Sequence, residues 1–175
     1  FTWEKQTAIL AQEAIDSLVP GKLTPFRIWD ELRLVFLEEN PWLAIEQIYK
    51  SGLWQLILPE IPFTPALALA FRQAPSLLLA WLPIFSEFDK VLFYVMILLN
   101  GLSKEVREQF VKDCQLPRYY RQQLAKVRET ADKLFALTQK LRHNGIKPSD
   151  LHPILQGVGD EGLLYFSIFG KTYIQ

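Results

Sequence analysis

The stretch LTPFRIWDEL at residues 23–32 sets the local fold of the chain, together with the breaks that follow it. Thr24 can cap a helix whose first residue is Pro25, because a proline at that position needs no amide partner. Asn40-Pro41 can end this helix and start the next. Gly52 can end the second helix, and the proline seven residues later blocks its continuation. The stretch therefore predicts two short helices followed by a stop.

Helical periodicity extends over nearly the whole chain, and no alternating strand pattern of useful length occurs. The sequence predicts an all-α fold with about nine helices. Five prolines are expected to cut residues 59–87 into short, broken helical pieces. Further helices are expected at residues 88–99, 103–113, about 117–143, from 148 onward, and 161–169. Asn144-Gly145 is the expected stop of the helix at about 117–143. In the helix that starts at 148, Pro153 is expected in the first turn.

Composition excludes several classes of protein. Of the 175 residues, 50% are hydrophobic and 13% are aromatic, which predicts a folded core rather than disorder. A single cysteine, Cys114, excludes a disulfide framework and fits a reducing, cytoplasmic compartment. The apolar runs at 75–85 and 91–99 are shorter than the roughly 20 residues of a membrane span, so they are interpreted as core helices. Neither a membrane nor DNA is expected as a partner.

Motifs that carry catalysis are absent from the sequence. It contains no G-x-x-x-x-G-K-[ST] or G-x-G-x-x-G phosphate loop, no Asp-x-Asp pair for magnesium and no H-E-x-x-H. The adjacent acids Glu38-Glu39 and Asp160-Glu161 point to different sides of a helix and are interpreted as solvated or capping residues. No catalytic residue and no metal ligand is therefore predicted on this chain.

Positive charge is concentrated in residues 103–147, which hold 11 Lys and Arg against 5 Asp and Glu, although the chain as a whole is neutral. Within the long helix, four cations fall inside an arc of about 80° and extend over about 30 Å. Such a row can follow a phosphate backbone without reading bases. The candidate RNA-binding residues are these four and two flanking arginines: Arg118, Lys126, Lys133, Lys140, Arg121 and Arg128.

The candidate residues can also be explained without a function. Because Glu129 and Asp132 interleave with the cations, a solvated helix face is the commoner explanation from charge alone. The second candidate feature, Arg27 with Glu31 one turn later, also reads as a surface ion pair of small energetic weight.

The order of motifs "R-I-x-x-E-L … N-P-x-x-A-I … G-L … I-L-P-E" resembles the region that follows the catalytic head in class II tRNA nucleotidyltransferases. This family contains the CCA-adding enzymes and the bacterial poly(A) polymerases. Phe1, Thr7 and Leu10 match the segment that leaves the head. Later stretches, Pro148-Ser149-Asp150-Leu151 and Glu161-Gly162-Leu163-Leu164, resemble helices beyond the body.

The resemblance implies a division into a neck-like domain at residues 1–60, a helical body at 61–146 and the start of a tail at 147–175. It implies that Arg27 and Glu31 brace the pocket that selects CTP or ATP. It also implies that the body and tail grip the acceptor–T arm of tRNA.

The catalytic motifs of the family are missing here, so the sequence is expected to begin inside a longer protein. The parent enzyme would transfer CMP or AMP to tRNA 3′ ends with Mg²⁺ and ATP or CTP, and the missing catalytic head would be a partner of this part. Whether it adds C, A or CCA is left open, because the selecting residues are absent. The alternative is a stand-alone helical module that binds a partner protein through an apolar face.

Overall fold

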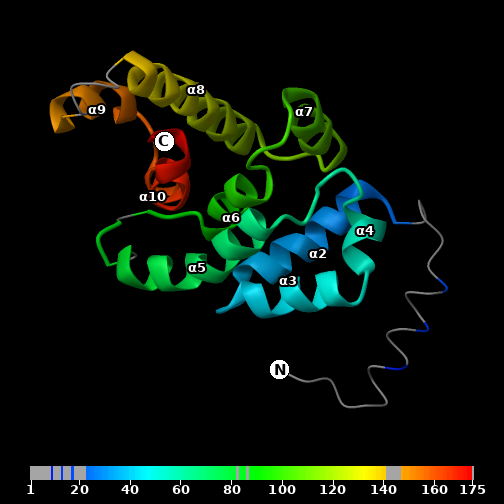
Figure 1. Ribbon diagram of the computed structural model, residues 1–175. Coiled ribbons are helices and arrows are strands. Elements are labelled where there is room, and N and C mark those ends of the chain that lie inside the picture. Colours follow the sequence, from blue (N-terminus) through cyan, green and yellow to red (C-terminus); the bar gives the residue numbers. More distant parts are fainter. Residues whose placement is uncertain are drawn as a thin grey trace. The chain divides into compact units, whose positions relative to one another are not determined.

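The computed structural model describes residues 23–140 except 82 and 86, residues 147–174, and the isolated residues 9, 13 and 17. Within these residues the chain forms helices and no strands, which confirms the all-α prediction (Figure 1). The described helices are α2 (Pro25–Leu37), α3 (Pro41–Lys50), α4 (Leu53–Ile57), α5 (Pro65–Trp81), α6 (Lys90–Leu98), α7 (Lys104–Asp113), α8 (Arg118–Lys140), α9 (Pro148–Leu155) and α10 (Asp160–Ile174).

The first helices begin and end where the sequence predicts. The Thr24 side chain accepts a hydrogen bond from the backbone N–H of Arg27 at 3.3 Å, and Pro25 occupies the first helical position. Gly52 ends the second helix with a φ of +77°, in the left-handed region where a residue without Cβ is least strained. Between Gly52 and Pro59 the chain adds the short helix α4, which the sequence did not indicate.

Helix α5 differs from the prediction of short, broken pieces, because it runs through Pro75 without interruption. A proline in a helix interior removes one backbone hydrogen bond and crowds the preceding turn. This helix nevertheless buries one side chain on nearly every turn on both sides of the proline: Leu67, Ala70, Phe71, Ala74 and Leu78. Burial of this continuous apolar stripe offsets the lost hydrogen bond.

Helix α6 is enclosed on all sides, as its uniformly apolar sequence predicts. Every residue from Val91 to Leu99 is buried. Asp89 caps its start, accepting a hydrogen bond from the backbone N–H of Leu92 at 2.9 Å through Oδ1.

The last three helices lie close to their expected positions. α8 ends its described part at Lys140, and the predicted stop at Asn144-Gly145 lies outside the described residues. α9 starts at Pro148 as expected, but Pro153 stands in its interior rather than in its first turn. Gly157, with a φ of +87°, separates α9 from α10. Phe1, Thr7 and Leu10, which carry the resemblance near the amino terminus, also lie outside the described residues.

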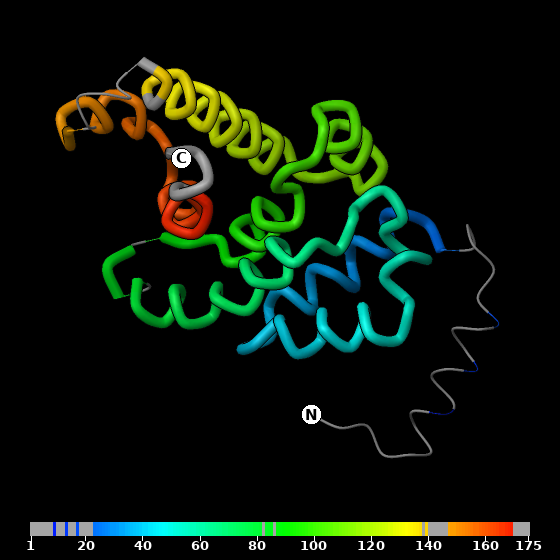
Figure 2. The backbone as a smooth tube through the Cα atoms, in the orientation of Figure 1, coloured from blue at the N-terminus to red at the C-terminus, as the bar shows by residue number. Residues whose placement is uncertain are grey.

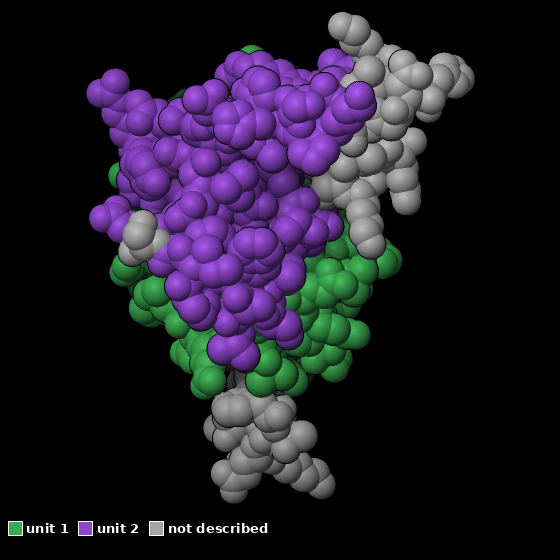
Figure 3. All heavy atoms as spheres, turned by 90° about the vertical axis from the view of Figure 1, so that its left-hand side faces the viewer, with its two compact units in different colours: residues 1–75, 98–115 green, residues 76–97, 116–175 purple. Residues whose placement is uncertain are grey.

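Two compact units share the chain, and each is built from two separate segments (Figure 3). Unit 1 comprises residues 1–75 and 98–115, and unit 2 comprises residues 76–97 and 116–175. The chain passes from unit 1 to unit 2 within α5, returns at the end of α6 and crosses again before α8, as its path in Figure 2 allows the reader to follow. The domain boundaries expected near residues 60 and 146 stay a prediction.

Unit 1 has an aromatic core. α2 contacts α3 and α7, and α3 contacts α4. The rings of Phe36 and Phe71 lie 6.2 Å apart in a stacked arrangement. Trp54, almost fully buried, donates its indole N–H to the carbonyl oxygen of Ile61 at 2.7 Å, so its polar atom is satisfied inside the core.

Unit 2 is organised around α8, which contacts both α9 and α10. Val127, Ala131 and Leu134 form its buried face, as the helical spacing predicts, while Tyr120 and Leu124 are half-buried. The close approach of α10 depends on Gly162. A Cβ added there would lie 2.9 Å from Cγ2 of Val127 and closer still to Val158.

Candidate functional site

Helix α8 carries the predicted cations on the side away from its buried face. Arg118, Lys126 and Lys133 are exposed, as expected for residues opposite Val127 and Leu134. Lys140 belongs to the same helix, but its side chain lies outside the described residues. The exposure of these cations is a consequence of packing, because α8 can bury only the stripe that faces α9 and α10.

Five of the six predicted cations of α8 form two lines along the edges of its exposed side, and Arg118 lies between these lines at the start of the helix. At 100° per residue, Lys126, Lys133 and Lys140 follow one edge, which we call the lysine line. Arg121 and Arg128 follow the other edge, roughly 150° away, and we call them the arginine line. Glu129 and Asp132 lie between the two lines. The positive surface is therefore divided rather than continuous.

Two of these cations are paired with acids one turn away on the same helix. Lys133 Nζ lies 2.6 Å from Glu129 Oε1, and Arg128 Nη2 lies 3.1 Å from Asp132 Oδ1. The hydrogen bond from Lys133, followed by its charge, lowers the pKa of the Glu129 carboxyl. Exposed pairs of this kind are weak, so both cations remain able to exchange their partner for a phosphate.

The other predicted cations differ in their surroundings. Arg121 donates from Nε to the carbonyl oxygen of Leu116 at 3.0 Å, which leaves the rest of its guanidinium exposed. Lys126 forms no ion pair with any described residue. Of the two lysines of the line whose side chains are described, Lys126 is thus the one whose charge is less compensated.

Arg27 and Glu31 are both exposed on α2, one helical turn apart. The opposite side of α2 is buried through Trp29, Leu32 and Phe36. No ion pair joins the two side chains, although both belong to the described residues. The geometry leaves them available to a ligand or a neighbouring domain, and their predicted bracing role stays a prediction.

No sequence pattern indicated the cluster of Asp89, Tyr120 and Glu161 in unit 2, in which Glu161 is buried and the other two residues are half-buried. Glu161 is only 4% exposed, so it is not the solvated acid that was one of the two roles expected for it. Its Oε1 accepts the backbone N–H of Asp89 at 2.7 Å, and Asp89 Oδ2 accepts the hydroxyl of Tyr120 at 2.7 Å. The cluster ties the starts of α6, α8 and α10 together and so fixes the first turn of the cationic helix.

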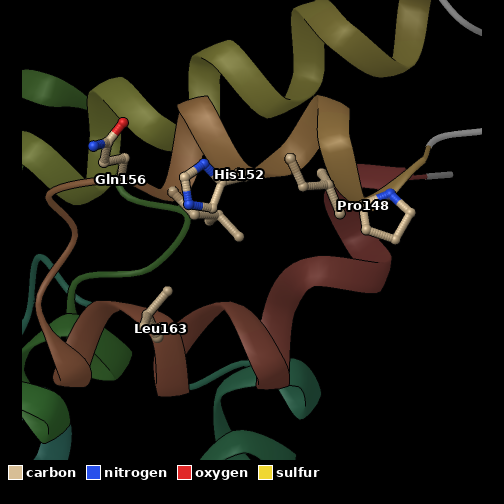
Figure 4. Close-up of a pocket in the computed structure, with 6 residues that line it drawn as sticks. Pro148, His152, Gln156 and Leu163 are labelled. Atoms are coloured by element: carbon tan, nitrogen blue, oxygen red, sulfur yellow. The ribbon is translucent and has the colours of Figure 1, made fainter.

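A shallow hollow of about 450 Å³ lies between α9 and α10 (Figure 4). Leu163 faces it from α10, and the α9 side supplies Pro148, Leu151, His152 and Leu155. Its lining is mainly apolar and holds no cationic cluster. Nothing in it is arranged to grip a phosphate chain.

Two further properties concern the described residues as a set. They contain no group of three or more His, Cys, Asp or Glu that could hold a metal ion. None of their helices combines the length and the apolar character needed to cross a membrane.

Comparison with known proteins gives relatives of one kind. A family model described as "Probable RNA and SrmB- binding site of polymerase A" matches residues 1–64. The A-adding tRNA nucleotidyltransferase of Geobacter sulfurreducens is 26% identical over 177 residues, which cover 98% of this chain and 20% of the relative. The chain thus spans about one fifth of the length of that enzyme.

Solved structures share the fold. A CCA-adding enzyme in an apo form matches with a TM-score of 0.69 and 20% identity, over 99% of this chain and 42% of that one. The Thermotoga maritima CCA-adding enzyme complexed with tRNA matches with a TM-score of 0.69 and 19% identity, over 99% and 43%. The sequence motifs, the family model and the related sequence agree with this fold, and together they show that the chain is similar to part of a tRNA nucleotidyltransferase.

Proposed function

We propose that this chain forms the RNA-binding helical part of a tRNA nucleotidyltransferase that adds CMP or AMP to tRNA 3′ ends. The observation that carries the proposal is the match to an A-adding tRNA nucleotidyltransferase along 98% of the chain. The name of the family model that matches residues 1–64 supports RNA as the ligand. The shared fold with a CCA-adding enzyme that was solved with tRNA supports it further.

Catalytic chemistry is assigned to the rest of such an enzyme. The described residues offer no group suited to Mg²⁺, so they do not fit the metal that nucleotide transfer by this family implies. We propose that the metal and the ATP or CTP are held outside this chain. The contribution of Arg27 and Glu31 would be to brace the nucleotide pocket from α2.

RNA would be held through its backbone and shape. Exposed lysine and arginine side chains on α8 can neutralise phosphates without reading sequence. The acceptor–T arm of tRNA is the proposed partner of this helix. The family model covers α2 and α3 but not α8, so Arg27 and Arg33 of α2 form a second candidate contact in unit 1.

A pair of charge reversals separates these contacts. Lys126→Glu with Lys133→Glu tests the lysine line, and Arg27→Glu with Arg33→Glu tests α2. Lys104→Glu with Lys112→Glu on α7 is the matched control, since both residues are exposed and the change in net charge is the same. Labelled tRNA is titrated with the 175-residue chain and its variants across a salt series.

The lysine-line variant is expected to bind more weakly and to flatten the plot of log affinity against log salt by roughly 1.5, because each lost phosphate contact removes about 0.7–0.9 from the slope. The control should behave like the wild type. Unchanged affinity and slope would show that the line is an ordinary solvated face. Wild-type binding to tRNA that does not weaken with salt would instead favour the alternative, a helical module that binds a protein through an apolar face.

A further inference from the structure

We propose that Tyr119 is a stacking site for an unpaired nucleobase of RNA, placed at the start of the lysine line. The inference rests on the RNA-binding function proposed above and adds a second kind of contact to it. Phosphate contacts give affinity that falls with salt, whereas stacking on an aromatic ring does not depend on charge. The two contributions can therefore be measured apart.

Tyr119 lies in line with the lysines of α8. Tyr119, Lys126, Lys133 and Lys140 follow one another at intervals of seven residues. Seven residues make almost two full turns, so the tyrosine continues the lysine line and lies about 10 Å from Lys126 along the axis. Tyr119 is 49% exposed, which leaves much of its ring open to a ligand. A strand whose phosphates follow the lysines would present its next nucleotides to this ring.

The Tyr119 ring is supported by the neighbouring side chain of Tyr120. The rings of Tyr119 and Tyr120 meet edge to face, with centroids 6.3 Å apart and planes at 63°. Tyr120 is itself held by its hydrogen bond to Asp89, within the cluster that also contains Glu161. A ring supported in this way loses little conformational freedom on binding, which favours stacking.

Local charge decides between a base and a phosphate. Partial burial raises the pKa of the Tyr119 hydroxyl, and the nearby carboxylates of Glu161, Asp89 and Glu87 raise it further. The same negative charges oppose a phosphate beside this ring. A nucleobase is uncharged and presents a flat face, so it is the part of RNA that suits the position. Phosphates are better placed beside the cations of α8, such as Lys126 farther along the helix.

The test compares two RNA probes, a tRNA with an unpaired 3′ end and a blunt-ended RNA duplex. Tyr119→Ala is expected to weaken binding of the tRNA about 5- to 150-fold, the range found for removal of one stacking ring. Its slope of log affinity against log salt should equal that of the wild type. Tyr119→Phe and Tyr119→Trp, which keep an aromatic face, should restore the affinity. Binding of the duplex should not change.

Phe135→Ala is the matched control, because Phe135 is an exposed aromatic residue of the same helix, at 55%, that lies off the lysine line. Circular dichroism and thermal unfolding check that each variant is folded. Equal tRNA affinity of Tyr119→Ala and wild type would overturn the inference, as would an equal loss on the duplex. A wild-type chain that binds neither probe would overturn the proposed function instead.

Discussion

At the scale of single residues, Glu161 shows how a buried carboxylate can hold a fold together. It accepts the backbone N–H of Asp89, a residue 72 positions away in sequence; Glu161 is buried and Asp89 is half-buried. A buried N–H that loses its acceptor costs the desolvation of that group. The cluster therefore stabilises the fold mainly because it provides hydrogen-bond partners for polar groups inside the protein, and less through attraction between its members.

We expect Glu161→Ala to lower the free energy of unfolding by about 1–3 kcal/mol, the cost of leaving a buried N–H unsatisfied. Glu161→Gln keeps an oxygen acceptor and should lose less. Tyr120→Phe, which removes one hydroxyl bond, should cost about 0.5–1.5 kcal/mol. Urea unfolding followed by circular dichroism measures all three. Equal stability of Glu161→Ala and wild type would contradict the role given to this carboxylate.

Cys114 is the residue whose chemistry burial suppresses. It is 3% exposed, its Sγ lies 3.6 Å from the carbonyl oxygen of Pro25, and burial, followed by the charge of Asp113, raises the pKa of its thiol to about 12. Since the thiolate is the reactive form, the native chain should resist a thiol reagent at pH 8 that labels the urea-unfolded chain within minutes.

The same pKa predicts how stability changes with pH. The thiol of the unfolded chain ionises near the ordinary cysteine pKa of 9.0, while the folded thiol, with its pKa raised to about 12, stays protonated until about pH 12. The contribution of Cys114 is therefore complete below pH 9 and is lost as the pH rises from 9 to 12. Cys114→Ala should show a smaller loss of stability over this window. Rapid labelling of the native chain at pH 8 would contradict both expectations.

At the scale of helices, the contact between α8 and α10 depends on a glycine. Gly162→Ala should lower the free energy of unfolding by about 1–3 kcal/mol, because the added Cβ has no room beside Val127 and Val158. Val158→Ala in the same chain should recover part of this loss by removing the nearer contact. Chemical denaturation of both variants and of Val158→Ala alone gives the coupling. If the effects of the two substitutions on the free energy of unfolding were strictly additive, the added Cβ would not be in contact with Val158, and this explanation would be contradicted.

In helix α5, tertiary packing outweighs the local conformational preference of the sequence. Its interior proline predicts a break, yet the helix continues because five side chains of one stripe are buried on both sides of it. Helix propensity is a local quantity of at most a few kcal/mol, and burial of several apolar side chains exceeds it.

At the scale of the whole molecule, the chain is expected to bind nucleic acid without catalysing transfer. The sequence has no Asp-x-Asp pair for magnesium, and the chain spans about one fifth of its A-adding relative. The purified 175-residue chain should therefore incorporate no labelled ATP or CTP into tRNA. The full-length A-adding enzyme of Geobacter sulfurreducens serves as the positive control for ATP. Measurable incorporation by the chain alone would contradict this expectation.

The local signals of the sequence correctly predicted the starts of α2, α3, α7 and α9 and the buried face of α8. The caps at Thr24 and Ser103 act on amides three residues away, and Gly52 acts through its own backbone angle. The burial of Val127 and Leu134 follows from helical spacing once α8 has any partner to pack on. These features need only neighbours within a turn or two, so the sequence determines them by itself.

Only the tertiary structure decided the features that depend on distant residues. The pairing of Glu161 with Asp89 joins positions that share no periodicity, and no local pattern distinguishes this buried acid from the exposed one beside it. The continuity of α5 through its proline and the division into two interleaved units likewise depend on which apolar surfaces meet. Local hydrogen bonds and spacing fix each helix, whereas burial between segments far apart in the chain decides how those helices combine.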